Sequence, residues 1–297
     1  MLKRIDLHIH TNCSDGAMTP KDIIDEAVKN GVSILSIADH DTVDAYSDEL
    51  FQYAKSKNIL IIPAVEISTK IKKCGIHVLG YNFDLHNKTF LDKLKSLRNA
   101  RHDYLYGVAA KLEELGYVVH TSELDKIEAV TKAHISLDVV SNPDNKEKLL
   151  EVFGHIPEKG EFIETIMNEG CPAYVKKNTV TPREAAELIR LAGGKVVLAH
   201  PVAYKYEDGL VEEDISSLVS NMNADGIESN YIYVNRNHQK INELDIWNEF
   251  AKKNHLHTSI GSDFHREDGI HPTIGLINES LQLTDKDISS ILEWLSE

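Results

Sequence analysis

Short apolar runs alternate along the chain with longer segments in which apolar residues recur at helical spacing. The apolar runs are Ile5–Ile9, Ile34–Ala38, Ile59–Val65, Ile76–Leu79, Val196–Ala199, Gly226–Ile227 and Leu256–Ile260. Runs of this length between amphipathic segments are typical of β-strands joined by helices. The order predicts an α/β protein built on a parallel sheet with helical crossovers.

Two of the predicted helices have clear signals at both ends. Thr19-Pro20-Lys21-Asp22 and Thr181-Pro182-Arg183-Glu184 each combine a threonine N-cap, a proline at the first helical position and an acid at the third. Gly31 and Gly193 follow these segments and are expected to end the helices. Because each helix then leads into an apolar run, the two units are predicted to be equivalent parts of one β/α barrel.

The middle of the chain has a different pattern. Residues 88–172 are mostly helical in pattern, with a long amphipathic run over Phe90–Leu115 and a single strand-like stretch at Tyr117–Val119. We therefore predict a barrel formed by residues 1–87 and 173–297, and a helical insertion over 88–172 that caps or flanks the barrel mouth.

Composition and charge limit the classes of function. With 42% hydrophobic and 27% charged residues among 297, the chain resembles an ordinary globular protein. No apolar run approaches the roughly 20 residues of a membrane span and the N-terminus turns polar early, so we expect a cytoplasmic protein. The three cysteines lie far apart, so we expect no disulfides. A net charge of −15 argues against a surface for duplex nucleic acid, but bound cations would still admit a phosphorylated substrate.

The first apolar run carries candidate metal ligands. Asp6-Leu7-His8-Ile9-His10 alternates strictly, and alternate residues of a strand share one face. His8 and His10 can therefore converge on one ion.

The other predicted strands repeat this arrangement at or near their C-terminal ends. The later runs supply Asp39-His40-Asp41, Glu66, His77, His200, Glu228, Asp263 and His265, and Asp15 lies just beyond the first run. In β/α barrels the C-terminal strand ends line the active site, and buried imidazoles and carboxylates must be paired or bind metal. Histidine with carboxylates and without thiolates suits Zn, Mn or Fe, and so many ligands imply two or three divalent ions.

Together these segments resemble the PHP superfamily, named for polymerase and histidinol phosphatase. The matching motifs are Asp6-Leu7-His8-Ile9-His10-Thr11, Ser14-Asp15-Gly16, Ala38-Asp39-His40-Asp41-Thr42, Val65-Glu66-Ile67-Ser68, His77-Val78-Leu79-Gly80-Tyr81, Ala199-His200-Pro201 and Gly261-Ser262-Asp263-Phe264-His265. The His77 motif, the insertion and Gly170–Val175 are similar to the branch of nucleotide and oligonucleotide phosphoesterases.

The resemblance implies a distorted (β/α)7 barrel with three metal ions. The implied ligands are His8, His10, Glu66 and Asp263 for the first ion, Asp15, His40 and His265 for the second, and Glu66, His77 and His134 for the third, with Glu66 bridging. The family usually has Arg-Pro-His where this chain has Lys132-Ala133-His134, so Lys132 would replace an arginine that can grip phosphate.

Further roles are expected for residues near the predicted site. Asp15 and Asp263 are expected to serve catalysis as metal ligands, and His200 to contact phosphate or to protonate the leaving oxygen. Lys132, His200, Arg236 and His238 are the candidate substrate contacts. Asp6 and Asp39 are predicted to orient ligand imidazoles, and Glu228 to line the pocket or cap a loop.

The resemblance implies hydrolysis of nucleotide phosphate esters, such as the 3′-phosphate of 3′,5′-bisphosphonucleotides, or of short 5′-phosphorylated oligonucleotides. Three alternatives stay open at this stage: a histidinol phosphate phosphatase, a non-catalytic metal-binding module, and a metal-dependent amide or lactone hydrolase. The expected partner is a small phosphorylated molecule, and the oligomeric state is open.

Overall fold

The computed structural model describes residues 4–72, 74–125, 127, 130–176, 179–235, 237–277 and 284–296. The chain divides into two compact units. Unit 1 comprises Met1–Leu94 and Val180–Glu297, and unit 2 comprises Lys95–Thr179. The insertion proposed over 88–172 overlaps unit 2.

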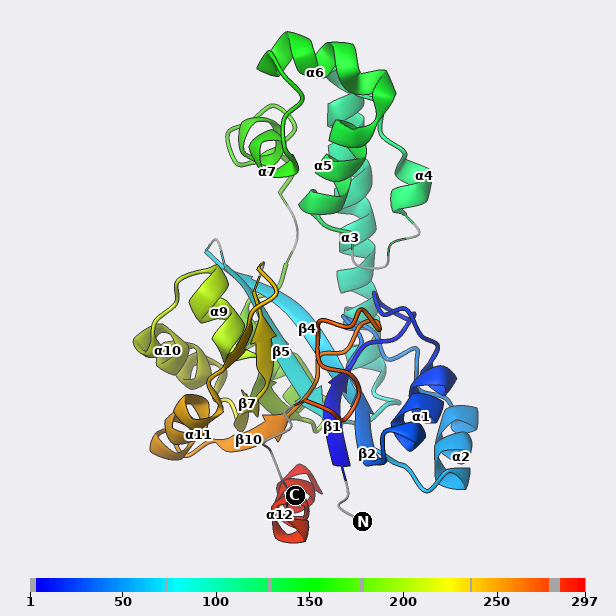
Figure 1. The fold of residues 1–297 in the computed structure, drawn as a ribbon, viewed down its shortest axis with the longest axis vertical. Helices are drawn as coiled ribbons and strands as arrows, with labels where there is room; N and C mark the ends of the chain where they lie inside the picture. Colours follow the sequence, from blue (N-terminus) through cyan, green and yellow to red (C-terminus); the bar gives the residue numbers. More distant parts are fainter. Residues whose placement is uncertain are drawn as a thin grey trace. The chain divides into compact units, whose positions relative to one another are not determined.

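Unit 1 is a mixed α/β structure, as the alternating pattern predicts (Figure 1). Its strands are β1 (Arg4–Ile9), β2 (Val32–Ile37), β3 (Leu60–Ile61), β4 (Ala64–Ile71), β5 (Cys74–Tyr81), β6 (Lys195–Leu198), β7 (Gly226–Asn230), β8 (Ile232–Val234), β9 (Lys240–Asn242) and β10 (His257–Ile260). They form three sheets with the orders β1-β2-β3, β10-β7-β6-β5-β4 and β8-β9.

The expectation of an all-parallel sheet is wrong at β5. This strand runs antiparallel to both β4 and β6. Only residues 72 and 73 separate β4 from β5, and so short a connection makes a hairpin, whereas a parallel pair needs a crossover of a dozen or more residues. His77, the candidate ligand on β5, therefore lies on a strand that runs opposite to both of its neighbours.

The predicted strand over Ile59–Val65 is also divided. Leu60–Ile61 pairs with β2, whereas Ala64 begins β4 in another sheet. Pro63 lies between the two strands and has no N–H to donate to a ladder. As a result Glu66 lies inside β4 and not beyond a strand end.

Strand pairing among the described residues does not close a barrel. Two isolated bridges nevertheless join the edges of the large sheets: Ile9 pairs with Phe264, and His40 pairs with Glu66. Both bridges lie at residues that directly adjoin the predicted site.

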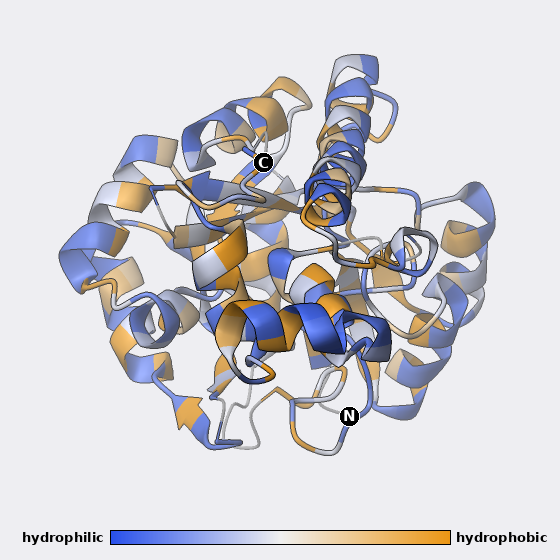
Figure 2. Ribbon diagram, turned by 90° about the horizontal axis from the view of Figure 1, so that it is seen from above, coloured by the Kyte–Doolittle hydropathy of each residue, from blue (hydrophilic) through white to orange (hydrophobic). Residues whose placement is uncertain are grey.

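Helices cover the outer faces of these strands. They are α1 (Pro20–Lys29), α2 (Asp48–Ser56), α8 (Pro182–Leu191), α9 (Pro201–Glu207), α10 (Glu212–Met222), α11 (Leu244–Lys253), α12 (Asp285–Ser296) and the first part of α3 (Lys88–Glu114). Both predicted capping boxes are present, at Thr19 with Asp22 and at Thr181 with Glu184. The helices carry apolar and polar residues in alternation (Figure 2), and the apolar ones fill cores against the strands.

Unit 2 is helical and has its own apolar core. It contains the rest of α3, then α4 (Thr121–Leu124), α5 (Lys132–Ser141), a 3-10 turn at Pro143–Asn145, α6 (Lys146–Phe153), α7 (Lys159–Phe162) and a π-helical turn at Ile163–Met167. The strand predicted at Tyr117–Val119 is absent from the described residues of this unit. The Asn145 side chain hydrogen-bonds both the N–H and the carbonyl of Val118, so this extended segment needs no partner strand.

The described helices include none with both the length and the apolar character that crossing a bilayer would require.

Candidate metal centre

Four side chains from three strands or their ends form a first group of ligand atoms. His8 lies in β1, Glu66 in β4, and His10 and Asp263 come shortly after β1 and β10. The Nε2 atoms of His8 and His10 are 3.1 Å apart, and Glu66 Oε2 lies 3.3 Å from each. Asp263 Oδ1 lies 3.5 Å from His8 Nε2 and 3.1 Å from His10 Nε2.

These spacings match a ligand shell. Ligand atoms about 2.1 Å from a tetrahedral ion lie roughly 3.4 Å from one another. Five of the six distances within the group fall between 3.1 and 3.5 Å. The four side chains are therefore arranged as they would be around one divalent ion.

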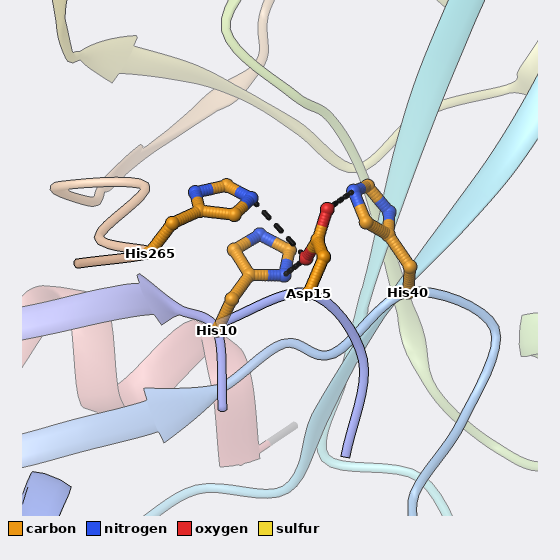
Figure 3. Close-up of side chains that lie close together, drawn as sticks. All are labelled: His10, Asp15, His40 and His265. Carbon is orange, nitrogen blue, oxygen red and sulfur yellow. Dashed lines mark ion pairs between the residues drawn. The ribbon is translucent and has the colours of Figure 1, made fainter. Parts of the chain in front are cut away.

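A second group surrounds Asp15 (Figure 3). Its carboxylate lies 3.3 Å from His265 Nε2, 3.6 Å from His10 Nδ1 and 3.7 Å from His40 Nε2. The rings of His10 and His265 are stacked with centroids 4.1 Å apart. His10 thus presents one ring nitrogen to each group, so the two groups are contiguous.

Glu66 is the centre of the whole cluster. Its Oε1 lies 3.0 Å from His77 Nδ1 and 3.1 Å from His200 Nε2, and its Oε2 lies 3.1 Å from His40 Nδ1. With His8 and His10, five imidazoles therefore approach one carboxylate. His40, Glu66 and His77 form a third group that is suited to a metal ion.

Buried charges in the cluster shift the pKa values of its members. Burial alone would raise the pKa of the Glu66 carboxyl, but its histidine neighbours, His77 first, hold that pKa well below its usual range. The pKa of Asp263 is likewise held well below its usual range, against burial, by His8 and His10. Both acids therefore present negative charge inside the protein, where charge must be paired or bind metal.

The imidazoles are placed as metal ligands would be. His8 Nε2 and His10 Nε2 face each other at 3.1 Å, where two unprotonated nitrogens would repel. His10 Nδ1 is buried and has no hydrogen-bond partner among the described residues. Unprotonated histidines beside ionised carboxylates are the ligand set of Zn, Mn or Fe. The donor set fits a cluster of divalent ions.

One carboxylate outside the ligand groups orients His8. Glu228, buried in β7, lies 3.0 Å from His8 Nδ1 and accepts a hydrogen bond from the His200 backbone N–H at 2.9 Å. This contact fixes the ring so that Nε2 faces the cluster. This contact with His8 was not predicted from the sequence, because Glu228 was expected to line the pocket or cap a loop. The position of Glu228 on a predicted strand was the signal available.

Asp6 and Asp39 have a different role from the one predicted. Among the described residues, neither side chain has a hydrogen bond to an imidazole. Asp39 accepts bonds from Thr11 N, Thr11 Oγ1 and Ser14 Oγ at 2.6 to 2.7 Å, and Asp6 accepts from the backbone N–H groups of Ser262 and Gly275. They hold the loops that carry the ligands, because backbone N–H groups in these turns need acceptors.

The approach of β10 to β1 requires a glycine at residue 261. A Cβ there would lie 2.2 Å from the His8 Cβ and 2.3 Å from Glu228 Oε1. Two residues later Asp263 adopts a positive φ of 54°, which is uncommon for a non-glycine residue. Backbone strain of this kind concentrates at functional sites, and here it turns the Asp263 carboxylate toward His10.

Comparison with known proteins identifies the family. The PHP domain model matches residues 6–195. The chain belongs to the PHP domain family. This confirms the resemblance drawn from the sequence motifs.

Relatives of this PHP protein are phosphoesterases of nucleic acids and nucleotides. It is 31% identical to a 5′-3′ exoribonuclease of Haemophilus influenzae over 89% of this chain and 91% of the relative. It is 26% identical to a 3′,5′-nucleoside bisphosphate phosphatase of Chromobacterium violaceum over 89% and 88%.

Solved structures share the fold. A Bifidobacterium adolescentis protein of the metal-dependent phosphoesterase class superimposes with a TM-score of 0.68 at 19% identity, over 98% of this chain and 96% of that one. An amidohydrolase of Chromobacterium violaceum, crystallised with sulfate, gives 0.64 at 25% identity over 90% and 89%. The first likeness concerns the fold alone.

The candidate substrate contacts of this PHP protein are dispersed. His200 lies in the cluster, buried, with its Nε2 toward Glu66. His238 is exposed in the turn between β8 and β9, and Arg236 lies outside the described residues. Lys132 and His134 are described within unit 2, where Lys132 Nζ donates to Asn168 Oδ1 at 3.0 Å and His134 joins a capping box with Thr131.

Two tyrosines beside the cluster were not predicted. Tyr231 Oη lies 3.4 Å from Asp263 Oδ2, and Tyr204 Oη accepts a hydrogen bond from the His77 backbone N–H at 2.8 Å. Tyr231 directly follows β7, so its position at a strand end was the signal available in the sequence.

Proposed function

We propose that this PHP protein is a metal-dependent phosphoesterase that hydrolyses phosphate esters of nucleotides. Its substrates would be 3′,5′-bisphosphonucleotides, cleaved at the 3′-phosphate, or short 5′-phosphorylated oligonucleotides. The observation that carries the proposal is the convergence of five imidazoles on Glu66, beside two further ionised carboxylates. The named activities of the two relatives supply the substrate class.

Three groups of residues would hold the ions, which we propose to be Mn, Fe or Zn. His8, His10, Glu66 and Asp263 would hold the first, Asp15, His40 and His265 the second, and Glu66 and His77 the third. The family resemblance adds His134 as a ligand of the third ion. Divalent ions in such sites lower the pKa of a water and neutralise phosphoryl oxygens. His10 and Glu66, which contact more than one group, would fix the spacing between the sites.

The protein's own groups position the substrate and move protons. His200 Nε2 faces Glu66 and His77 at 3.1 and 3.3 Å, so its ring edge lies where a phosphoryl oxygen or leaving oxygen would approach the cluster. We assign it the role of contacting phosphate or protonating that oxygen. Lys132, Arg236 and His238 stay proposed substrate contacts, with Lys132 acting as a point charge.

We also propose that unit 1 is a distorted (β/α)7 barrel. The two isolated bridges connect the sheets into the cyclic neighbour order β1-β2-β4-β5-β6-β7-β10. Such a ring would bring seven strands around one axis, with the ligand groups at one end.

The test measures product formation by purified protein with added Mn²⁺, together with its metal content: phosphate from the phosphomonoesters, nucleoside 5′-monophosphate from the oligonucleotide, and free amine from the amide. The panel holds adenosine 3′,5′-bisphosphate, a 5′-phosphorylated oligonucleotide, histidinol phosphate and an amide substrate. Turnover of the first two, lost in His8→Ala, is the expected result. Turnover of histidinol phosphate or of the amide alone assigns the protein to those reactions, and bound metal without turnover of any substrate makes it a binding module.

A further inference from the structure

A cavity opens directly beside the metal centre. It has a volume of about 610 Å³, within the range of roughly 300–1,000 Å³ that is usual for small-molecule sites. Asp263 and His265 of the cluster form one wall, and Tyr231 with β8 forms another. The loop over residues 266–272 forms the remaining side. We call this cavity the tyrosine pocket.

Tyr231 and Tyr233 give the tyrosine pocket a rigid aromatic wall. They are two residues apart on an extended segment and therefore share one face. Tyr231 is half-buried, with its hydroxyl 3.4 Å from Asp263 Oδ2 and its ring centroid 5.5 Å from that of His200. Tyr233 is buried and held by a ring stack on Tyr206. Such a wall suits the flat base or the ribose of a nucleotide.

On its loop side the pocket carries an arginine, Arg266, beside acids that other groups already hold. Two acids of the lining already have partners. Glu207 accepts a hydrogen bond from the Tyr233 hydroxyl. Asp268 accepts hydrogen bonds from two backbone N–H groups and lies 2.6 Å from His271 Nδ1. These bonds hold the pKa of Asp268 at about 2. Arg266 is exposed and has no ion-pair partner among the described residues. The guanidinium is therefore available for a phosphate, which it can bind with two parallel bonds.

The position of Arg266 relates that charge to the reaction. It directly follows His265 in the chain, so its side chain begins one residue from the metal centre and lines the pocket that leads away from it. A substrate with one phosphate at the cluster could therefore place a second phosphate at Arg266.

We infer that the tyrosine pocket binds the nucleoside of the substrate, with Tyr231 against the base or ribose and Arg266 on a second phosphate that is not cleaved. This inference rests on the proposed function and gives its substrate a required feature. The enzyme selects nucleotides that carry a phosphate on both sides of the sugar, as a 3′,5′-bisphosphonucleotide or the end of an oligonucleotide does.

The experiment compares adenosine 3′,5′-bisphosphate with adenosine 3′-monophosphate, which lacks only the second phosphate. The ratio of the two kcat/KM values is measured for the wild type, Arg266→Ala, Arg266→Lys and Arg183→Ala. Arg183 is a matched control, because it is exposed on α8 and pairs with Glu187. We expect Arg266→Ala to reduce the ratio about ten- to a hundred-fold, through KM, as loss of a charged hydrogen bond does. Lysine should restore part of it, and Arg183→Ala should leave it unchanged.

The aromatic wall is tested separately with Tyr231→Leu and Tyr231→Phe. Leucine should raise KM for both nucleotides about ten-fold relative to glycerol 3-phosphate, whereas phenylalanine should keep most of the affinity. An equal loss on glycerol 3-phosphate would show that Tyr231 only supports Asp263, and it would overturn the nucleoside assignment.

Equilibrium binding of the two adenosine nucleotides to the Mn²⁺-loaded protein separates this inference from the proposed reaction. Binding that depends on Arg266 without turnover supports the pocket and contradicts the reaction. Turnover of both nucleotides with a ratio insensitive to Arg266 supports the reaction and overturns the pocket. Failure of both nucleotides to bind or react contradicts both.

Discussion

The histidines of the cluster in unit 1 and the surface histidines of unit 2 have opposite environments. In unit 2, His102, His120 and His155 each pair with one carboxylate, at 2.5 to 3.0 Å, and their side chains are 46 to 59% exposed. In unit 1, His8 and His10 are fully buried and share Glu66 and Asp263 with each other.

The difference shows what distinguishes a site from a surface pair. An exposed imidazole with its own acid completes its interactions with water and contributes little to stability. A buried group of imidazoles around shared carboxylates is arranged as the ligands of metal ions are, and a buried charge must be paired or bind metal. Four experiments test this contrast.

Removing the shared carboxylate should have the largest effect. Glu66→Ala takes a ligand from two of the three groups and should lower turnover by about a thousand-fold or more, since the ions supply several kcal/mol to the transition state. Bound metal should fall with it. Glu187→Ala, which removes an exposed acid paired with Arg183, is the control and should change neither quantity. Full activity in Glu66→Ala would contradict the role of the cluster.

Removing the metal should destabilise unit 1 selectively. At a metal concentration of about 100 times Kd, binding contributes roughly 2.7 kcal/mol to the free energy of unfolding. Chelation should therefore lower Tm and increase amide hydrogen exchange around residues 10–16 and 261–265. Exchange in the helices of unit 2 away from His134 should stay the same, because His102, His120 and His155 have partners of their own. A uniform increase across both units would count against a cluster centred on Glu66.

The orienting carboxylate should have an intermediate effect. Glu228→Gln keeps the shape but weakens the acceptor for His8 Nδ1, and such changes beside a metal site typically cost about 10- to 100-fold in metal affinity or activity. Metal titration and kcat/KM measure both. Asp225→Asn is the comparison, because Asp225 bonds the Val196 N–H and Arg190 outside the cluster. It should alter stability while metal affinity stays unchanged.

The surface pairs should have the smallest effect. His120→Ala removes the bond to Asp138 in unit 2 and should change the free energy of unfolding by no more than about 1 kcal/mol. Metal content and turnover should be those of the wild type. Chemical denaturation with a metal assay would reveal any larger role of this histidine.

The local signals of the sequence identified much of the fold. The capping boxes at Thr19 and Thr181 and the amphipathic run that became α3 depend on neighbouring residues alone, and each is present. The direction of β5 and the division of Ile59–Val65 were missed, because both depend on which strand pairs with which.

The sequence by itself determined the family and the kinds of ligand atoms, since motifs such as Asp6–Thr11 and Gly261–His265 record residue type and order. Only the tertiary structure decided how those atoms are shared. Strand pairing between distant segments placed five histidines around Glu66 and brought Glu228 into contact with His8. It also let Asp6 and Asp39 accept hydrogen bonds from the loops that carry the ligands. Such contacts join residues as far as 269 positions apart in the chain, as Asp6 and Gly275 are, and local pattern carries no information about distances across the fold.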